Sequence, residues 1–366
     1  MQRSNEYGHD EKVQGGCGLF GIINVKRKLV PGSVIIDAIS VLHDRGNGLG
    51  GGFAAYGIYP EYKDYYAFHV MYENKEAIAP TEAYLAQFFN VTYHEQIPTR
   101  VTKAIQAHPL FYRYFVQPKE EAKALLPNKD ENDFVVGKVM YINENITDAF
   151  VVSSGKNMGA FKGVGYPEEI AEFFKLEGYK ACSWTAHNRF PTNTKGWWGG
   201  AHPFTLLDWA IVHNGEISSY GINKRFLEMY GYKLTMLTDT EVITYLFDLL
   251  VRRFGFDFRT AALVLASPFW KNIDAMPGEE RKVLTALRML YGSALLNGPF
   301  AVILSHNRGF VGLSDRIKLR PMVAAQVGDY YYLSSEESAI RKINPSLDRV
   351  WFPKAGEPVI IDFEQE

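Results

Sequence analysis

The sequence predicts an α+β fold in which antiparallel sheets are stacked between layers of helices. Near the start of the chain, an apolar strand over 17–25 precedes a helix over 33–42 whose apolar residues recur at helical spacing. The chain ends in two hairpins, one turning at 306–309 and the other at 328–329. Helices come in pairs instead of alternating with single strands, which argues against repeated βαβ units.

The first half of the chain contains further strands and a region of different texture. Two strands, 53–59 and 67–72, follow a glycine-rich turn at 45–52 and are expected to pair with each other. Residues 73–133 carry prolines that separate short elements, and this predicts an inserted subdomain. Beyond it, strands are expected at 134–142, 150–154 and 158–164, followed by a helix that begins at Pro167.

The second half begins with two strands, 181–186 and 209–213. A helix is expected over 223–230, because Gly231 is a typical residue after a helix C-terminus. A second helix begins at the Thr238-x-x-Glu241 capping box and continues to about residue 254.

Composition excludes several classes of protein. The 366 residues are 47% apolar, with no run of 18 uncharged apolar residues, which is typical of a globular chain without a membrane span. A net charge of −2 argues against a nucleic-acid or membrane-surface protein. With Cys17 and Cys182 alone there is no disulfide framework, so the sequence predicts a reducing, cytoplasmic location. Cys182, inside an apolar strand, is expected to lie in the core.

Cys17 opens the first strand in a run crowded with glycines. A thiol at the start of a strand can use its own α-amino group as general base if the preceding peptide bond is cut, because that amine has a pKa of roughly 7.7–8.0. Residues 1–16 have no apolar region and are not a secretory signal. They are either a disordered terminus or a leader that masks the amine of Cys17.

Two segments further along carry groups that suit amide chemistry. Arg189 follows a strand and can grip a carboxylate with two hydrogen bonds, although a structural ion pair is the commoner role for an arginine. The glycines and tryptophans at 196–200 are typical of a lid over a small ligand. Asn214 and Gly215 can aim an amide and a backbone N–H at one oxygen, as an oxyanion hole requires. The same dipeptide is also the commonest hairpin turn.

Two charged residues complete the set. Asp239, at the start of a helix, is either a cap or a partner for a substrate ammonium group. Arg45, where a helix gives way to the glycine turn, either supports the site electrostatically or stabilises the turn. A thiol, two oxyanion donors, an arginine for a carboxylate and an aspartate for an ammonium together describe hydrolysis of a free amino-acid amide such as glutamine.

Two further patterns in the sequence do not indicate a cofactor or metal site. The G-x-G-x-x-G match at 46–51 follows a helix and precedes a strand, whereas a dinucleotide fingerprint needs the reverse order. His187, His202 and His213 lack the spacing of a metal motif, so no metal site is expected.

The order of motifs resembles the class II glutamine amidotransferases, which belong to the N-terminal-nucleophile hydrolases. The matching segments are Cys-Gly-x-Phe-Gly, His-x-Arg-Gly, Asn-Arg-Phe-x-Thr-Asn, His-Asn-Gly-Glu-Ile and Thr-Asp-Thr-Glu-Val-Ile. The third and fourth most resemble the amidotransferase domain of the glutamate synthase large subunit. The resemblance covers nearly the whole chain from Cys17 onward, except 73–133, and implies a four-layer αββα sandwich.

The resemblance also implies roles for individual residues. Cys17 would be the nucleophile, and Asn214 with Gly215 would form the oxyanion hole. The substrate would be clamped by Arg189 and Asp239, with two further residues lining the pocket, Thr192 and Asn193. The simplest members of the family place this cysteine directly after the initiator methionine, so here activity is expected to require cleavage between Gly16 and Cys17.

We therefore expect residues 1–16 to be a leader and 17–366 a glutamine amidotransferase domain without a cofactor of its own. It would hydrolyse glutamine to glutamate and pass the ammonia to a separate synthase subunit, similar to the FMN- and iron–sulfur-containing glutamate synthases. Two alternatives stay open: a glutamine-binding regulatory subunit whose leader is never removed, and an N-terminal-nucleophile acylase that acts on another amide. Arg189 and Asp239 favour a free amino acid, because both of its charged ends need partners.

Overall fold

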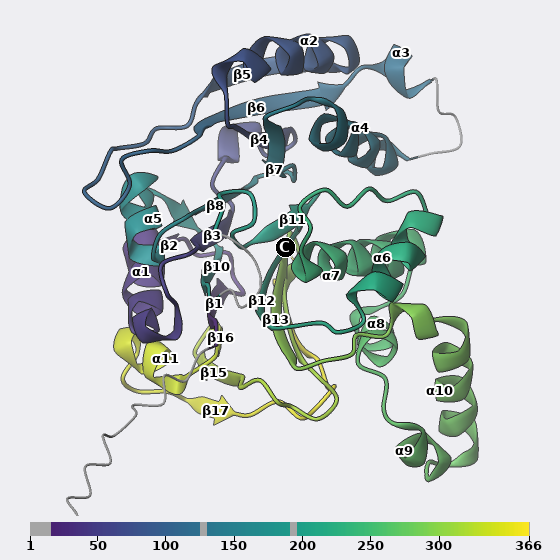
Figure 1. Ribbon diagram of the computed structural model, residues 1–366. Helices are drawn as coiled ribbons and strands as arrows, with labels where there is room; N and C mark the ends of the chain where they lie inside the picture. Colours follow the sequence, from purple (N-terminus) through teal and green to yellow (C-terminus); the bar gives the residue numbers. More distant parts are fainter. Residues whose placement is uncertain (1–15, 125–129, 191–195, 366) are drawn as a thin grey trace, which may run out of the picture.

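Two antiparallel sheets, stacked face to face, form the centre of the molecule (Figure 1). The computed structural model describes residues 16–124, 130–190 and 196–365. Within these residues the first sheet has seven strands, in the order β17(Arg349–Trp351), β15(Val323–Val327), β16(Tyr330–Ser334), β1(Gly18–Asn24), β10(Ser183–Asn188), β3(Gly51–Tyr56) and β8(Met158–Gly163). The second has five strands, in the order β11(Phe204–Leu206), β12(Trp209–Gly215), β13(Phe300–His306), β14(Gly309–Ser314) and β18(Val359–Asp362).

The two sheets share a dry core. Leu19 and Ile23 on β1 face Val212 on β12 and Ile303 on β13, and all four side chains are buried. Because side chains alternate along a strand, the other face of β1 turns Phe20 and Ile22 towards the outer helices. Both faces of the central strands are therefore buried, as stacked sheets between helical layers require.

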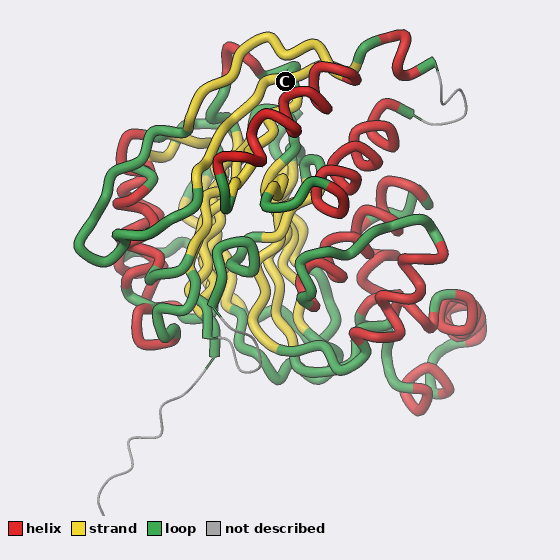
Figure 2. Tube along the Cα trace, turned by 45° about the horizontal axis from the view of Figure 1, so that its top comes forward, coloured by secondary structure: helices red, strands yellow, loops and turns green. Residues whose placement is uncertain are grey.

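Helices cover the outer faces of both sheets (Figures 1 and 2). The seven-stranded sheet is covered by α1(Gly32–Ser40), α5(Pro167–Phe173) and α11(Glu337–Ile343). The five-stranded sheet is covered by α6(Tyr220–Met229), α7(Asp239–Phe247), the π-helical turn Asp248–Arg253 that continues α7, and α8(Phe258–Leu265). The order helix, sheet, sheet, helix is the expected αββα sandwich.

A third sheet and its helices lie above the sandwich in Figure 1. Its four strands run in the order β5(Phe89–Gln96), β6(Leu110–Pro118), β4(Tyr66–Tyr72) and β7(Ala149–Ser153), and its helices are α2(Ile78–Phe88), α3(Glu120–Lys123) and α4(Glu131–Asn145). Two of these strands, β5 and β6, fall within the expected insertion 73–133, and the other two flank it. The boundaries of that insertion stay a prediction.

Two predicted local features in this region are wrong. The segment 134–142 is part of α4 and not a strand: Phe134, Val135, Val139 and Ile142 are buried at helical spacing, and the Asp130 side chain caps the helix by accepting from Asp133 N. The strand 67–72, here β4, does not pair with the strand before it. It pairs with β6 and β7, while β3 pairs with β10 and β8.

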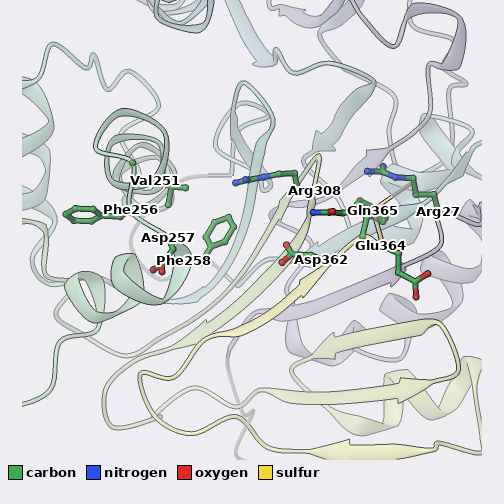
Figure 3. A pocket seen from close by; sticks show the side chains of 11 residues that line it. Arg27, Val251, Phe256, Asp257, Phe258, Arg308, Asp362, Glu364 and Gln365 are labelled. Carbon is green, nitrogen blue, oxygen red and sulfur yellow. The ribbon is translucent and has the colours of Figure 1, made fainter. Parts of the chain in front are cut away.

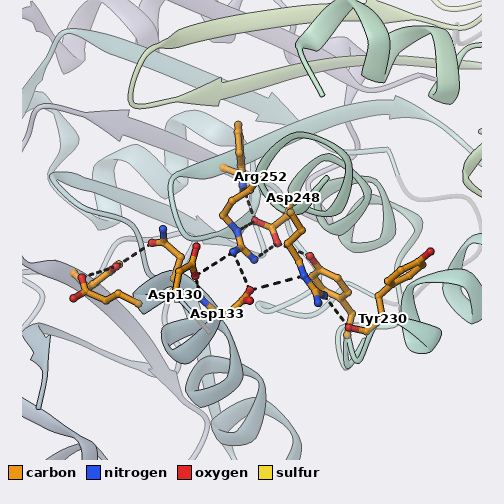
Figure 4. A network of polar contacts seen from close by, with 11 residues as sticks. Asp130, Asp133, Tyr230, Asp248 and Arg252 are labelled. Carbon is orange, nitrogen blue, oxygen red and sulfur yellow. Dashed lines mark hydrogen bonds and ion pairs between the residues drawn. The ribbon is translucent and has the colours of Figure 1, made fainter. Parts of the chain in front are cut away.

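An ion-pair network joins the third sheet's helices to the sandwich (Figure 4). Arg252 holds the buried Asp248 through Nε and Nη2, at 2.7 and 2.8 Å, and donates through Nη1 to Asp133 on α4 at 2.9 Å. Asp248 also accepts from Trp209 Nε1 at 2.9 Å. The network therefore fixes α4 against the layer that carries α7.

The remaining elements are peripheral. They are β2(Val30–Pro31), which pairs with β9(Lys180–Ala181), and the pair α9(Trp270–Asp274) and α10(Gly278–Leu290), which projects at the lower right of Figure 1. Across the ranges that the structure describes, we find no helix with the length and apolar character needed to cross a membrane.

Candidate active site

Cys17 lies where the first strand begins, beside the end of β10. The register pairs Gly18 with Asn188, so the residue before β1 and the residue after β10 are neighbours. The backbone N–H of Phe190 donates to Cys17 Sγ at 3.3 Å. Burial raises the pKa of the Cys17 thiol, and this outweighs the opposite effects of the Phe190 hydrogen bond and of the Arg189 charge. The raised pKa keeps this thiol in its protonated form.

Arg189 enters the same place from the end of β10. Its side chain is buried, and burial lowers the pKa of the guanidinium, while Cys17 and Asp239 act in the opposite direction. Arg189, Cys17 and Asp239 therefore lie near one another, and we call the region that they border the pocket. The two further expected pocket residues, Thr192 and Asn193, lie outside the described residues.

Asn214 brings an amide to this pocket from the neighbouring sheet. The side chain is 1% exposed, and within the described ranges neither Oδ1 nor Nδ2 has a hydrogen-bond partner. A Cβ built on Gly16, the residue before Cys17, would lie 3.7 Å from Asn214 Oδ1. An unpaired buried amide is costly in a fold unless a ligand or water completes it, so Asn214 is suited to receive a substrate oxygen.

The alternative that Asn214 and Gly215 form a hairpin turn is wrong. Both residues belong to β12, where they pair with Ala301 and Phe300. Gly215 has φ 135°, and a Cβ there would lie 1.9 Å from the Pro299 carbonyl oxygen. The chain bends at this point in a way that only glycine accommodates.

Asp239 is the first residue of α7, but it is not the cap of that helix. Thr238 caps α7 by accepting from Thr240 N at 3.1 Å. Asp239 Oδ2 instead accepts from Ile217 N at 3.0 Å, which ties α7 to the segment after Gly215. Burial alone would raise the pKa of this carboxyl, but His213 and the hydrogen bonds outweigh it and hold the pKa below its ordinary value. Asp239 is thus kept ionised.

Two arginines flank the backbone around Cys17. Arg45 Nε donates to the Cys17 carbonyl at 3.2 Å, and Arg45 Nη1 pairs with Glu336 at 2.8 Å. Arg320, in the loop between β14 and β15, has its Nη1 3.5 Å from a Cβ built on Gly16. No sequence motif marks Arg320, and only the fold brings it here.

A buried histidine cluster lies behind Asp239. His213 N donates to His202 Nδ1 at 3.3 Å, so neutral His202 carries its proton on Nε2, which faces Thr240 Oγ1 at 3.3 Å. Thr240 Oγ1 in turn lies 3.1 Å from His213 Nδ1 and 3.3 Å from Asp239 Oδ1. His187 stacks on His202 with ring centroids 3.9 Å apart. Burial lowers the pKa of His187 to about 3, so both stacked rings are neutral.

Lys162 and Glu241 are also buried close to this cluster. Lys162 Nζ donates to the Gly199 carbonyl at 2.9 Å, in the segment that was expected to form part of a lid. Burial lowers the pKa of Lys162 to about 7 and raises that of Glu241 to about 7. Within the described ranges, no group of three or more histidine, cysteine or acidic side chains is placed to hold a metal ion.

A separate cavity of about 820 Å³ lies between the turn after residue 251 and the end of β18 (Figure 3). Arg27 and Arg308 face it together with three acidic residues, Asp257, Asp362 and Glu364. Its lining includes none of Cys17, Arg189, Asn214 and Asp239.

Comparison with known proteins assigns the chain to a family. The family model for glutamine amidotransferases class-II matches residues 67–365, most of the chain. The chain belongs to the class II glutamine amidotransferases. The matched span begins after β1, so the assignment to the family does not depend on Cys17.

Individual relatives fall into two groups. A protein of Archaeoglobus fulgidus without an assigned function is 53% identical over 96% of this chain and 93% of its own length. The glutamine amidotransferase-like protein GlxB of Rhizobium meliloti is 26% identical over 59% of this chain and 62% of its own length. The glutamate synthase [NADPH] large chain of Bacillus subtilis is 25% identical over 60% of this chain, which corresponds to 15% of that protein. The chain therefore spans only part of the relatives with a described activity.

Among solved structures, the glutamine phosphoribosylpyrophosphate amidotransferase of Bacillus subtilis is similar over 94% of this chain and 47% of its own. The TM-score is 0.47 and the sequence identity 17%.

Proposed function

We propose that this protein is a glutaminase subunit in which Cys17, freed as the N-terminal residue, hydrolyses the side-chain amide of glutamine. The observation that supports this most directly is the convergence at Cys17. The Phe190 N–H points at the thiol, and Arg189 and Asp239 act on its pKa. The unpaired Asn214 amide lies next to the residue before Cys17.

The substrate's two charged ends would be bound by the two clamp residues. Arg189, buried and positively charged, suits the α-carboxylate of glutamine. Asp239, held ionised by its hydrogen bonds, suits the α-ammonium group. A peptide or an acylated amine lacks one or both of these charges, so the pair favours a free amino acid over the substrates of the acylase alternative.

The reaction would proceed through a thioester. The α-amino group of Cys17 takes the thiol proton as Sγ attacks the side-chain carbonyl carbon, and Asn214 Nδ2 with Gly215 N–H stabilises the oxygen that becomes negative. The amine returns the proton to the departing nitrogen as the C–N bond breaks, and ammonia leaves. Water then attacks the γ-glutamyl thioester, giving glutamate and the free thiol.

This mechanism requires the Gly16–Cys17 bond to be cut. A peptide nitrogen has no lone pair available for proton transfer. While the bond is intact, the thiol has a raised pKa and its own backbone nitrogen cannot act as the base. We propose that the leader 1–16 is removed before turnover, and that ammonia passes to a separate synthase subunit of the glutamate-synthase type.

The test is intact mass and N-terminal sequencing of the protein from its native cells, together with glutamate release from glutamine. We expect a chain that begins at Cys17 and is active, and loss of activity in Cys17→Ala. Cys182→Ala is the matched control, because Cys182 is buried between the sheets and its loss leaves the pocket unchanged. A chain that keeps residues 1–16 and shows no turnover would favour the regulatory alternative instead.

A further inference from the structure

The loop that carries Arg320 into the active site also forms part of an exposed apolar face. On this loop, Ile317 and Leu319 are 54% and 60% exposed. Phe269 and Trp270 at α9 and Phe352 after β17 are also exposed. We call these five residues the docking face.

Contacts join the three segments into one surface. The Arg316 guanidinium lies over the Phe269 ring at 4.2 Å, and Lys318 Nζ lies over the Phe352 ring at 5.5 Å. A Cβ built on Gly356, just after Phe352, would lie 3.8 Å from the Arg316 backbone. The docking face is therefore continuous although its residues are far apart in sequence.

The loop is held rigidly with its apolar side chains outward. Asp315 is 2% exposed, and its carboxylate accepts from the backbone N–H groups of Phe300, Ile317 and Leu319, at 3.0 to 3.1 Å. These bonds fix the shape of the loop, so Ile317 and Leu319 do not fold back into the core. Contiguous apolar side chains displayed on a fixed backbone are typical of an interaction site.

Four cations border the docking face and form its rim: Arg288 lies over the Trp270 ring, Arg316 over Phe269 and Lys318 over Phe352, and Lys354 follows Phe352 in the chain. No carboxylate lies within ion-pairing distance of Arg288, Arg316 or Lys318 in the ranges 16–124, 130–190 and 196–365, whereas Lys354 pairs with Glu357 at 3.8 Å. Burial, and after it the neighbouring Arg316, lowers the pKa of Arg288, so two like charges lie close together. A partner with carboxylates around an apolar centre would relieve this repulsion. A second copy of this chain would bring the same positive rim.

We propose that the docking face binds the acidic, apolar-centred surface of the subunit that receives the ammonia. This rests on the proposed glutaminase function. One loop connects the two places: Arg320 reaches Gly16, next to Cys17, while Ile317 and Leu319 form the outer surface. A partner seated here would lie at the side of the molecule where Arg320 borders the site of ammonia release.

The alternative docking surface for the same partner is the region of the third sheet. It lies at the opposite end of the molecule in Figure 1, with α4 at the top and α9 at the bottom. Tyr141 on α4 is 46% exposed and serves as a probe there. The photo-crosslinking residue p-benzoylphenylalanine would be introduced at Phe352 in one variant and at Tyr141 in another. Each variant would be produced in the native cells, irradiated, and purified by a tag on the C-terminus.

The expected result is an adduct at position 352, and none at 141, with a protein that makes its product from free ammonia. The proposal would be overturned by an adduct with another protein at position 141 alone, or by no adduct at either position. It would also be overturned by an adduct with a second copy of this chain or with its residues 1–15. An adduct at 352 with a protein that does not consume ammonia would overturn it as well. The purified chain would also be sedimented with phosphatidylserine vesicles. If it binds them, and charge reversal of the rim removes the binding, the docking proposal is overturned in favour of a membrane surface.

Charge reversal tests the functional consequence in the same complex. We expect Lys318→Glu combined with Lys354→Glu to lower glutamine-dependent synthesis about tenfold at low salt, because rim charges control encounter and salt dependence. Glutamate release by the chain and ammonia-dependent synthesis by the partner should stay unchanged. The matched control is Lys63→Glu with Lys75→Glu, which makes the same change in net charge at two exposed residues that flank β4 of the third sheet.

The readouts separate the two proposals. Loss of coupling with normal glutamate release supports the docking face. Equal coupling in both double variants overturns it and leaves the glutaminase proposal intact. Absence of glutamate release in the unmodified complex refutes the glutaminase proposal itself.

Discussion

Two buried asparagines at strand ends give a sharp test of the proposed oxyanion hole. Asn188 ends β10, and its Nδ2 donates to the carbonyls of Leu42 and His43, at 2.8 and 2.9 Å. Asn214, next to the end of β12, has no partner for either side-chain atom within the described ranges. Replacement by alanine should therefore lower activity at Asn214 and lower stability at Asn188.

Asn214→Ala should remove activity and leave stability almost unchanged. Loss of one oxyanion donor lowers kcat by about 10²–10³, or roughly 2.7–4 kcal/mol of transition-state stabilisation. Because no hydrogen bond is lost, the free energy of unfolding should change by less than about 1 kcal/mol. Asn188→Ala removes the donor to a buried and a partly buried carbonyl and should cost about 1–3 kcal/mol of stability.

The assay is glutamate release at saturating glutamine by chains that begin at Cys17, together with urea unfolding of both variants. An oxyanion role for Asn214 is refuted if Asn214→Ala keeps more than a tenth of the wild-type kcat. The role is also refuted if Asn214→Ala is destabilised as much as Asn188→Ala, because the amide would then be a structural group.

Four further variants test the remaining features. Asp239→Asn should raise KM for glutamine by about 10- to 100-fold, since a hydrogen bond to a charged group contributes about 1.5–3 kcal/mol; an unchanged KM would remove Asp239 from the binding site. Gly215→Ala should lower the free energy of unfolding by at least about 1–3 kcal/mol, because φ 135° and the 1.9 Å approach to a carbonyl exclude a side chain, and calorimetry would detect this. Arg252→Ala should cost about 3–5 kcal/mol in urea unfolding, because it leaves Asp248 buried without its ion pair; a cost below about 1 kcal/mol would contradict a structural role for Figure 4's network. Lys162 has a pKa of about 7 in the folded protein, so between pH 7 and 10 it binds fewer protons in the folded state than in the unfolded state. The free energy of unfolding should therefore rise over this range by up to about 1.4 kcal/mol per pH unit, and Lys162→Met should abolish the rise.

The sequence predicted the layers because these depend on local patterns, and the same patterns locate the element ends that carry the candidate site residues. Glycines around Cys17, the strand before Arg189 and the Thr238 cap each identify an element end, and the fold brings those ends together. Asn214 was ambiguous, because Asn-Gly suits both a turn and an oxyanion hole. Its pairing with Ala301 on β13, a long-range contact, excludes the turn.

Two features could not be predicted for physical reasons. The β-branched run in 134–142 has strand propensity, but burial of one helical face decided its structure, and burial depends on tertiary packing. Arg320 reaches the pocket through the β14–β15 loop, whose path is set by the Asp315 hydrogen bonds. Neither Arg320 nor Asp315 belongs to a motif that residue spacing in the sequence could reveal.

The geometry around Gly16 links the processing step to catalysis. Arg45 holds the Cys17 carbonyl, while Arg320 and the Asn214 amide lie within van der Waals reach of a side chain at position 16. The groups that we assign to the oxyanion and its surroundings thus border the peptide bond that must be cut. Cleavage would both create the amine that serves as the base and remove the residue that borders Asn214. One bond would then control proton transfer and substrate access together, so partial activity in an uncut chain is not expected.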